Sequence, residues 1–247
     1  MSFFKKLFGT SDVAHEYMAH TDSKYTFPIA KSEQELIEIY GGLGFEKQAD
    51  VPAVVGENSW HFSMETGSIT FGQLAFPVQI LGTISHGSKT WLWAWANDKS
   101  GIPSHLKQQA FKLKEYGNTN QIELLSAAQF NATIDDVHLI GCVSSGMFDS
   151  SCYYIADYGQ GAMLVTIHDR AFDKVEKQEH LRILTTFPQL ISAFDMNHRH
   201  ALKCYLLAKG YSISEADYSV TGKKSGPSLT VEFDTFNRCI NVNSSVR

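Results

Sequence analysis

Apolar and polar residues alternate along residues 60–97, and this period of two constrains the fold more than any other feature of the chain. Trp60 and Phe62 alternate with polar neighbours, which is typical of a β-strand with one buried face. Residues 66–68 predict a turn into a second strand, and residues 86–89 predict a further turn. Residues 60–97 are therefore predicted to form an antiparallel meander.

Segments with helical periodicity lie on both sides of this meander. Ser32 and Glu35 have capping-box spacing and predict a helix start, and Gly41-Gly42 predicts its end. Apolar spacing predicts further helices that begin near Pro103, Thr133, Phe187 and Asn197, with stops at Gly117-Asn118 and Gly210. Strand alternation returns at residues 151–156, 162–168, 216–220, 229–233 and 239–242.

Helices and hairpins interleave in this chain without regular βαβ units. This order favours an α+β fold, with an antiparallel sheet packed against several amphipathic helices, over a parallel α/β fold. We expect a leader segment at residues 1–30, a main α+β domain at 31–170, and a helix-plus-hairpin portion at 171–247 packed on it as one body. Met64-Glu65-Thr66 loosely echoes Phe233-Asp234-Thr235, which leaves two similar lobes as an alternative.

Composition restricts the class of partner. Hydrophobic residues make up 43% of the chain and charged residues 19%, enough apolar material for a core. The 21 Lys and Arg residues are outnumbered by 26 Asp and Glu residues, so nucleic acid is not an expected partner. Four cysteines lie far apart in the sequence without a C-x-x-C pair, which predicts reduced, buried thiols.

The apolar stretches are shorter than the ~20 residues that span a bilayer, and a cytoplasmic protein is expected. Phe3, Phe4, Leu7 and Phe8 surround two lysines and suggest a short amphipathic turn on a membrane surface. The other interpretation is an N-terminal segment that packs on the body or frays. Neither interpretation gives stable membrane anchoring.

Aromatic residues supply the candidate binding site. Trp91, Trp93 and Trp95 are predicted on one side of a strand, either as a core face or as a platform for a ligand or partner. Asn97 follows them as a turn former or as a polar group at the rim of a pocket. Tyr153 and Tyr154 are the expected rim of a concave sheet surface.

The run Thr90-Trp91-Leu92-Trp93-Ala94-Trp95-Ala96-Asn97 resembles a motif of an uncharacterised bacterial family, domain of unknown function 6882. Two further features occur in the same order as in the family: the strand from Phe76 to Thr83, which precedes the motif, and the Tyr153-Tyr154 pair, which precedes a glycine turn. The likeness covers roughly residues 35–168. It implies a bacterial origin and a shared fold, and it implies no activity or ligand.

Reactive residues are dispersed along the chain. His198-Arg199-His200 suggests a metal site, but positions two apart diverge by roughly 200° on a helix, so no metal or cofactor is expected. Cys142, Ser144, Ser145 and Cys152 have no recognised nucleophile motif around them. The small residues Gly141–Gly146 would follow a helix, and close packing explains them better than phosphate binding.

The favoured hypothesis is a non-enzymatic binding or protein-interaction module, whose partner the sequence does not identify. One alternative is a hydrolase in which His138, His168 or His198 meets a carboxylate and a nucleophile only in the folded chain. A second alternative is a toxin-immunity protein, which would fit an acidic, compact chain.

Overall fold

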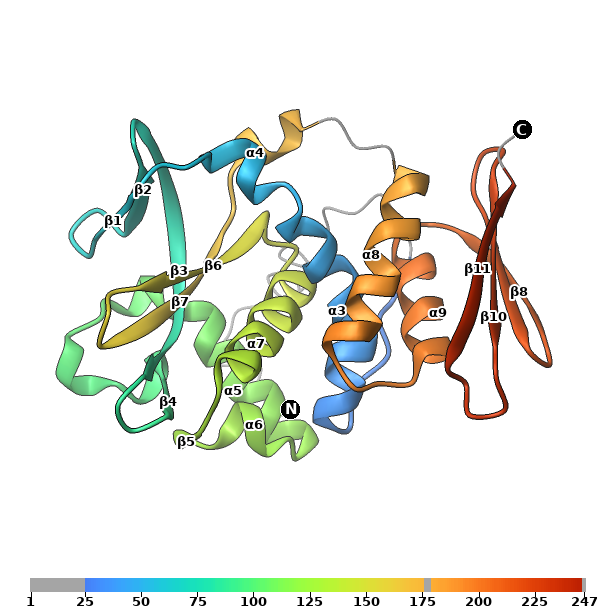
Figure 1. Cartoon of the computed structure of the whole chain (residues 1–247). Helices are drawn as coiled ribbons and strands as arrows, with labels where there is room; N and C mark the ends of the chain where they lie inside the picture. Colours follow the sequence, from blue (N-terminus) through green and yellow to red (C-terminus); the bar gives the residue numbers. More distant parts are fainter. Residues whose placement is uncertain (1–24, 176–178, 246–247) are drawn as a thin grey trace, which may run out of the picture.

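Two antiparallel sheets flank a layer of helices. The structure, a computed structural model, describes residues 25–175 and 179–245. Figure 1 shows one sheet at each side of the molecule and the helices between them. The predicted α+β class with antiparallel sheets is confirmed.

The described helices and strands include the predicted helices and hairpins, together with α4, α6 and β5, which the sequence patterns did not predict. The helices are α3 Glu33–Gln48, α4 Val51–Val55, α5 Gln108–Asn120, α6 Glu123–Ser126, α7 Ile134–Met147, α8 Glu179–Ala193 and α9 His198–Ala208. The strands of the first sheet are β1 Trp60–Ser63, β2 Ser68–Phe71, β3 Leu74–Ser85, β4 Thr90–Trp93, β5 Gln129–Asn131, β6 Cys152–Asp157 and β7 Gly161–Ile167. Those of the second sheet are β8 Ser212–Ala216, β9 Ser219–Lys223, β10 Ser228–Phe233 and β11 Cys239–Ser245.

The first sheet is built around the long strand β3. The strands β1 to β5 pair in sequence order, and β7 pairs with both β3 and β6. The predicted meander and the second hairpin, β6–β7, are therefore confirmed. The helix α7 also begins as predicted, because Thr133 and Asp136 form a capping box at its start.

The helix α3 does not end at Gly41-Gly42, so that prediction is wrong. It continues to Gln48 because its glycines lie where neighbouring helices approach closely. A Cβ on Gly42 would lie 2.6 Å from the Tyr205 ring, and one on Gly44 would lie 1.9 Å from the Cys142 carbonyl oxygen. The glycines are therefore contact points between helices and do not end α3.

The same contact explains the small residues Gly141–Gly146. They lie inside α7 and do not follow it, which corrects their predicted position. A Cβ on Gly146 would lie 2.1 Å from the carbonyl oxygen of Tyr40 on α3. The predicted role in close packing is confirmed, since α3 and α7 approach backbone to backbone.

Three other predicted boundaries are wrong. The helix α8 already includes Glu179 and contains Pro188, whereas the sequence predicted a start near Phe187. The helix α5 continues past Gly117 to Asn120. Residues 216–220 form two strands, because the chain turns at Asp217-Tyr218 between β8 and β9.

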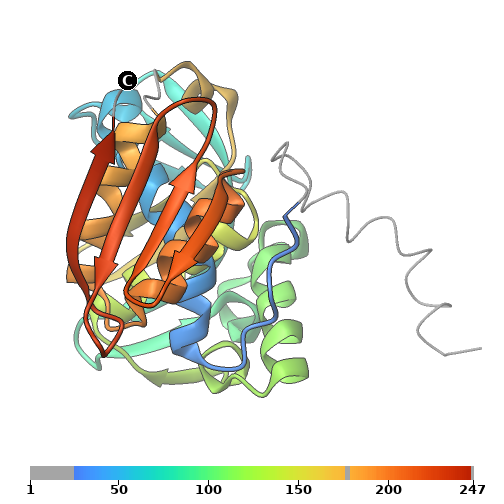
Figure 2. The same cartoon turned by 90° about the vertical axis from the view of Figure 1, so that its right-hand side faces the viewer.

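The second sheet is a four-stranded meander with one covered face. Its inner side chains Val220, Leu229, Val231 and Phe233 are buried, and Gly222 faces Leu206 of α9. Figure 2 shows the opposite face of this sheet with no described element in front of it. The outward residues of β9 and β10 include Thr221 and Thr230, whose hydroxyls are 2.9 Å apart.

The leader prediction falls mostly on residues 1–24, which lie outside the described residues, and so does the amphipathic turn at Phe3–Phe8. The two sheets have seven and four strands, and the alternative of two similar lobes stays a prediction. Within the part of the chain that the structure describes, no helix has the length and apolar character needed to cross a membrane.

Candidate functional site

Trp91 and Trp93 lie in the core of the first sheet. Both side chains are 0% exposed, and their rings meet edge to face with centroids 5.3 Å apart. The Trp93 Nε1–H donates a hydrogen bond to the Leu124 carbonyl oxygen at 3.1 Å. This placement agrees with the core interpretation and leaves no part of either indole open to a partner of the folded chain.

Trp95 lies outside β4, in a short 3-10 helix at Ala94–Ala96, so the three tryptophans do not share one strand as predicted. Its half-buried ring lies 4.0 Å from Lys114 Nζ, a cation–π contact. Asn97 Oδ1 accepts hydrogen bonds from the backbone N–H and the hydroxyl of Ser100, at 3.3 and 2.9 Å. Asn97 is therefore the turn former of the two alternatives.

Tyr153 and Tyr154 pack within the chain. The Gln48 side chain, at the end of α3, exchanges two hydrogen bonds of 3.0 Å with the backbone of Tyr153 and so pairs with β6 as a strand would. The buried Tyr153 hydroxyl lies 2.9 Å from His138 Nδ1. The half-buried Tyr154 ring meets Phe71 edge to face at 4.8 Å. Packing within the chain occupies both rings.

The candidate nucleophiles of the hydrolase alternative are buried. Burial raises the pKa of Cys142 to about 12, although the nearby Tyr153 hydroxyl partly opposes this shift. Burial also raises the pKa of Cys152 to about 12. Both thiols stay protonated at neutral pH, whereas the thiolate is the nucleophile. The Ser144 hydroxyl donates to the Ile140 carbonyl oxygen at 2.6 Å, a bond within α7.

The histidines of the predicted metal and hydrolase sites contact different elements. Asn197 caps α9 as predicted, and His198 Nδ1 accepts the Cys239 N–H of β11 at 3.0 Å. His200 Nδ1 lies 2.7 Å from the Glu38 carboxylate of α3. His138 and His168 lie on α7 and after β7. Among the residues described, no three His, Cys, Asp or Glu side chains are placed to hold a metal ion.

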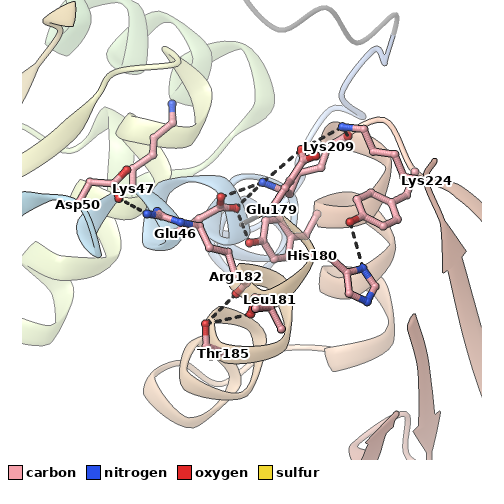
Figure 3. Close-up of polar contacts among 12 residues, drawn as sticks. Glu46, Lys47, Asp50, Glu179, His180, Leu181, Arg182, Thr185, Lys209 and Lys224 are labelled. Carbon is pink, nitrogen blue, oxygen red and sulfur yellow. Dashed lines mark hydrogen bonds and ion pairs between the residues drawn. The ribbon is translucent and has the colours of Figure 1, made fainter. Parts of the chain in front are cut away.

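A network of charged side chains joins α3 to the C-terminal helices (Figure 3). The buried Glu46 carboxylate accepts a hydrogen bond from the Tyr205 hydroxyl and two bonds of 2.8 Å from Lys209 Nζ. Lys209 Nζ also lies 3.7 Å from Glu179, which pairs with Lys224 at 2.9 Å. The network therefore extends from α3 through α8 and α9 to the end of β9.

A second branch of the network lies beside the first. Arg182 of α8 pairs with the buried Asp50 carboxylate, and Lys47 pairs with Asp149 at 2.6 Å. Taken together, four carboxylates face four cations: Glu46, Asp50, Asp149 and Glu179 with Lys47, Arg182, Lys209 and Lys224. Among the residues that the structure describes, the charges of these eight side chains balance, and the network joins elements of the fold.

The turn between β10 and β11 presents the most exposed large apolar side chain of the described residues, Phe236, at 75% exposure. The Asp234 carboxylate accepts the backbone N–H groups of Phe236 and Arg238 at 2.8 and 2.9 Å and the Arg238 Nε–H at 2.7 Å. These bonds, that of the Arg238 N–H foremost, hold the pKa of Asp234 below its usual value. The turn is thus fastened by a carboxylate while its aromatic ring stays open to solvent.

The turn between β8 and β9 presents Tyr218 at 58% exposure. Arg199 of α9 donates to the carbonyl oxygens of Ala216 and Asp217 at 2.7 and 2.6 Å, and the Tyr218 carbonyl oxygen accepts the Phe233 N–H at 2.8 Å. The register of β8 to β11 places both turns at the same end of the sheet, the lower end in Figure 2. We call Tyr218 and Phe236 the aromatic turn pair.

Sequence reasoning did not find the aromatic turn pair. The residues Asp234–Arg238 separate two predicted strands and so form a turn. Within it, Phe236 lies between an aspartate and an arginine that can form an ion pair, and this pattern is a signal for an exposed aromatic residue. Tyr218 was assigned to the interior of a strand, which hid its position in a turn. The charged network was missed because Glu46 and Lys209 are 163 residues apart.

The two antiparallel sheets and the helix layer define an α+β protein without a recognised catalytic motif. The chain belongs to a family of unknown function, DUF6882, whose model matches residues 34–170. This match confirms the family resemblance, and it extends from the start of α3 to just after β7. No curated protein and no solved structure matches the chain.

Proposed function

We propose that this protein is a non-enzymatic protein-interaction module of the bacterial cytoplasm. The partner binds at the aromatic turn pair and offers an apolar pocket to Phe236. The exposure of Phe236 and Tyr218 at one end of the second sheet carries this proposal. Aromatic side chains contribute strongly to binding energy when a partner buries them.

The order of the two turns supports the proposal. Asp234 fixes the turn around Phe236, and Arg199 fixes the turn that contains Tyr218. Binding by a turn that is already ordered loses little conformational entropy, which favours affinity. The partner surface therefore lies on the C-terminal sheet and not at Tyr153 and Tyr154, whose rings pack within the chain.

The two alternatives differ from this proposal in their chemistry. A cysteine hydrolase would need a thiolate, and the raised pKa values of Cys142 and Cys152 weigh against one. Toxin immunity is a special case of the same interaction, in which the partner is a toxin; the formal charge of -5 would suit a basic toxin. The identity of the captured protein separates these two cases.

The proposal is tested by affinity capture with the tagged full chain, followed by binding of the purified partner. Replacing both Tyr218 and Phe236 by alanine should remove capture and weaken the measured Kd by about tenfold or more, since both anchors are lost. Neither side chain is buried, so the variant should keep the wild-type unfolding midpoint.

Tyr158→Ala is the matched control, because Tyr158 is also an exposed aromatic residue in a turn, that between β6 and β7. It should leave capture and Kd unchanged. If the double variant binds the partner as the wild type does, or if Tyr158→Ala weakens binding equally, the proposed surface is wrong.

A further inference from the structure

The strand β11 is one edge of the second sheet and pairs only with β10 among the described strands. Figure 2 shows it as the outermost strand on its side. Its residues, Cys239–Ser245, include no charged residue and no proline. An edge strand presents unpaired N–H and C=O groups that another strand can bind, and natural edges are usually protected by charge, proline or a covering element.

The other edge of the same sheet, β8, has such protection. Glu215 of β8 points to α9, where it pairs with Arg199 at 3.2 Å and Lys203 at 2.7 Å. Arg199 also donates to the carbonyl oxygens at the end of β8. An inward charge of this kind opposes the addition of a further strand. No residue that the structure describes protects β11 in this way, so of the two edges β11 is the one open to pairing.

The part of β11 that can pair is regular. A bulge lies near Ile240, which is 65% exposed, and the register with β10 is continuous from Asn241 to Ser245. Asn241 faces outward, where its Nδ2 donates to Glu232 at 3.3 Å. Ser244 faces inward, where its hydroxyl lies 2.7 Å from His180 Nε2 of α8. By alternation, Asn243 faces outward at the centre of this five-residue stretch.

We infer that β11 pairs with β11 of a second copy of this chain, antiparallel about a twofold axis at Asn243, to form an eight-stranded sheet. In this arrangement Asn243 lies opposite Asn243 of the other copy. A twofold interface must be self-complementary. The asparagine amide meets this requirement because it both donates and accepts hydrogen bonds. An uncharged strand also meets itself without repulsion between like charges.

The helix beneath β11 supports a second copy as the occupant. Leu181 of α8 is 47% exposed and follows His180, the residue that bonds to Ser244. An extended sheet places the two α8 helices side by side beneath its centre. The interface then buries Leu181, and the neighbouring Ile240 adds exposed apolar surface at the same edge.

The inference is tested by sedimentation velocity on the full chain over a wide range of concentration. The wild type should shift from monomer to dimer as concentration rises, whereas Asn243→Lys and Asn243→Asp should each stay monomeric through like-charge repulsion. An equimolar mixture of these two variants should form a heterodimer, because Lys then faces Asp. Circular dichroism of each variant tests that it is folded. Dimerisation in the mixture would show that the β11 edge strand is still intact in both variants.

Ser214→Lys on the outward face of β8 is the matched control and should dimerise as the wild type does. Tyr218→Ala/Phe236→Ala should also dimerise, so the failure of this inference is distinguishable from the failure of the proposed function. A wild type that stays monomeric at every concentration would overturn the inference. Dimerisation of Asn243→Lys alone, or a mixture that stays monomeric, would overturn it as well.

Discussion

Lys209, directly after α9, donates two hydrogen bonds of 2.8 Å to the buried carboxylate of Glu46 on α3. Glu46 lies within the family region, residues 34–170, and Lys209 lies outside it. The contact therefore fastens the C-terminal helices, and through them the second sheet, to the part of the chain that defines the family. The aromatic turn pair lies on the second sheet and therefore depends on this contact for its position.

Glu46→Ala should lower the free energy of unfolding by about 3 kcal/mol, because it leaves the Lys209 ammonium and the Tyr205 hydroxyl buried without their shared acceptor. Denaturant unfolding followed by circular dichroism measures the loss. Asp157→Asn is the comparison, since the pair of Asp157 and His86 is exposed and its loss should shift the unfolding midpoint much less. Equal losses in the two variants would show that the network does not stabilise the fold.

Gly44→Ala should destabilise the protein by about 3 kcal/mol, because the added Cβ meets the Cys142 carbonyl oxygen of α7 and forces α3 and α7 apart. The same measurement on Gly87→Ala should give a change of less than about 0.5 kcal/mol, since no atom lies within 4 Å of a Cβ at Gly87. If Gly44→Ala unfolds at the wild-type midpoint, the close approach of α3 and α7 is wrong.

The sequence predicted elements whose signals are local. The capping box at Thr133 and Asp136 and the cap at Asn197 each involve residues a turn apart, and both starts are confirmed. The turns at residues 66–68 and 86–89 of the first sheet followed from glycine and from alternation. Boundaries that depend on tertiary packing were missed: glycine at 41 and 42 predicts a helix end, whereas Gly42 contacts the Tyr205 ring and Gly44 the α7 backbone inside a continuous helix.

The candidate site was less predictable than the fold. Three alternating tryptophans suggested one face, but the strand ends after Trp93 and the chain turns at Ala94–Ala96, so Trp95 leaves that face. Burial of Trp91 and Trp93 follows from their large apolar area and agrees with the core face, one of the two alternatives. Exposure of Phe236 depends on how the turn is oriented in three dimensions, which periodicity does not determine.

Trp93→Phe should cost about 2 kcal/mol of stability, because it removes buried apolar surface and leaves the Leu124 carbonyl oxygen without its donor. The folded variant should bind the partner with wild-type affinity, since Trp93 lies in the core. Isothermal titration of the purified partner measures this affinity, and unfolding measures the stability. If the variant has unchanged stability and binds the partner more weakly, Trp93 belongs to the binding site and not to the core.

His200 should make stability depend on pH. Hydrogen bonds with Cys204 and Glu38 raise the pKa of His200 to about 10 from an unfolded value of 6.5. Its contribution is therefore complete below pH 6.5 and is lost as the pH rises through about 10. Burial raises the pKa of Glu38, but hydrogen bonds from His200, Asn197 and Gln34 outweigh burial, so the folded pKa is lower than the unfolded value of 4.5. The contribution of Glu38 to stability is therefore present above pH 4.5 and is lost as the pH falls through the folded pKa.

His200→Gln should accordingly destabilise the protein more near pH 6 than near pH 10. The difference should be about 1 kcal/mol, a value reduced for solvent screening because the His200 side chain is 38% exposed. Unfolding of the variant and the wild type at both pH values measures it. An equal loss at the two pH values would mean that His200 does not carry a charge in its contact with Glu38.

The most direct measurement of the proposed function places a photo-crosslinking amino acid at position 236 of the full chain in living cells, with the same substitution at Tyr158 as the matched position. Illumination should join one discrete protein to position 236, and this adduct should be absent from position 158. An excess of wild-type chain without the photo-crosslinking amino acid should prevent the adduct by competition. The same adduct at both positions, or no adduct at position 236, would contradict the claim that the aromatic turn pair binds a partner.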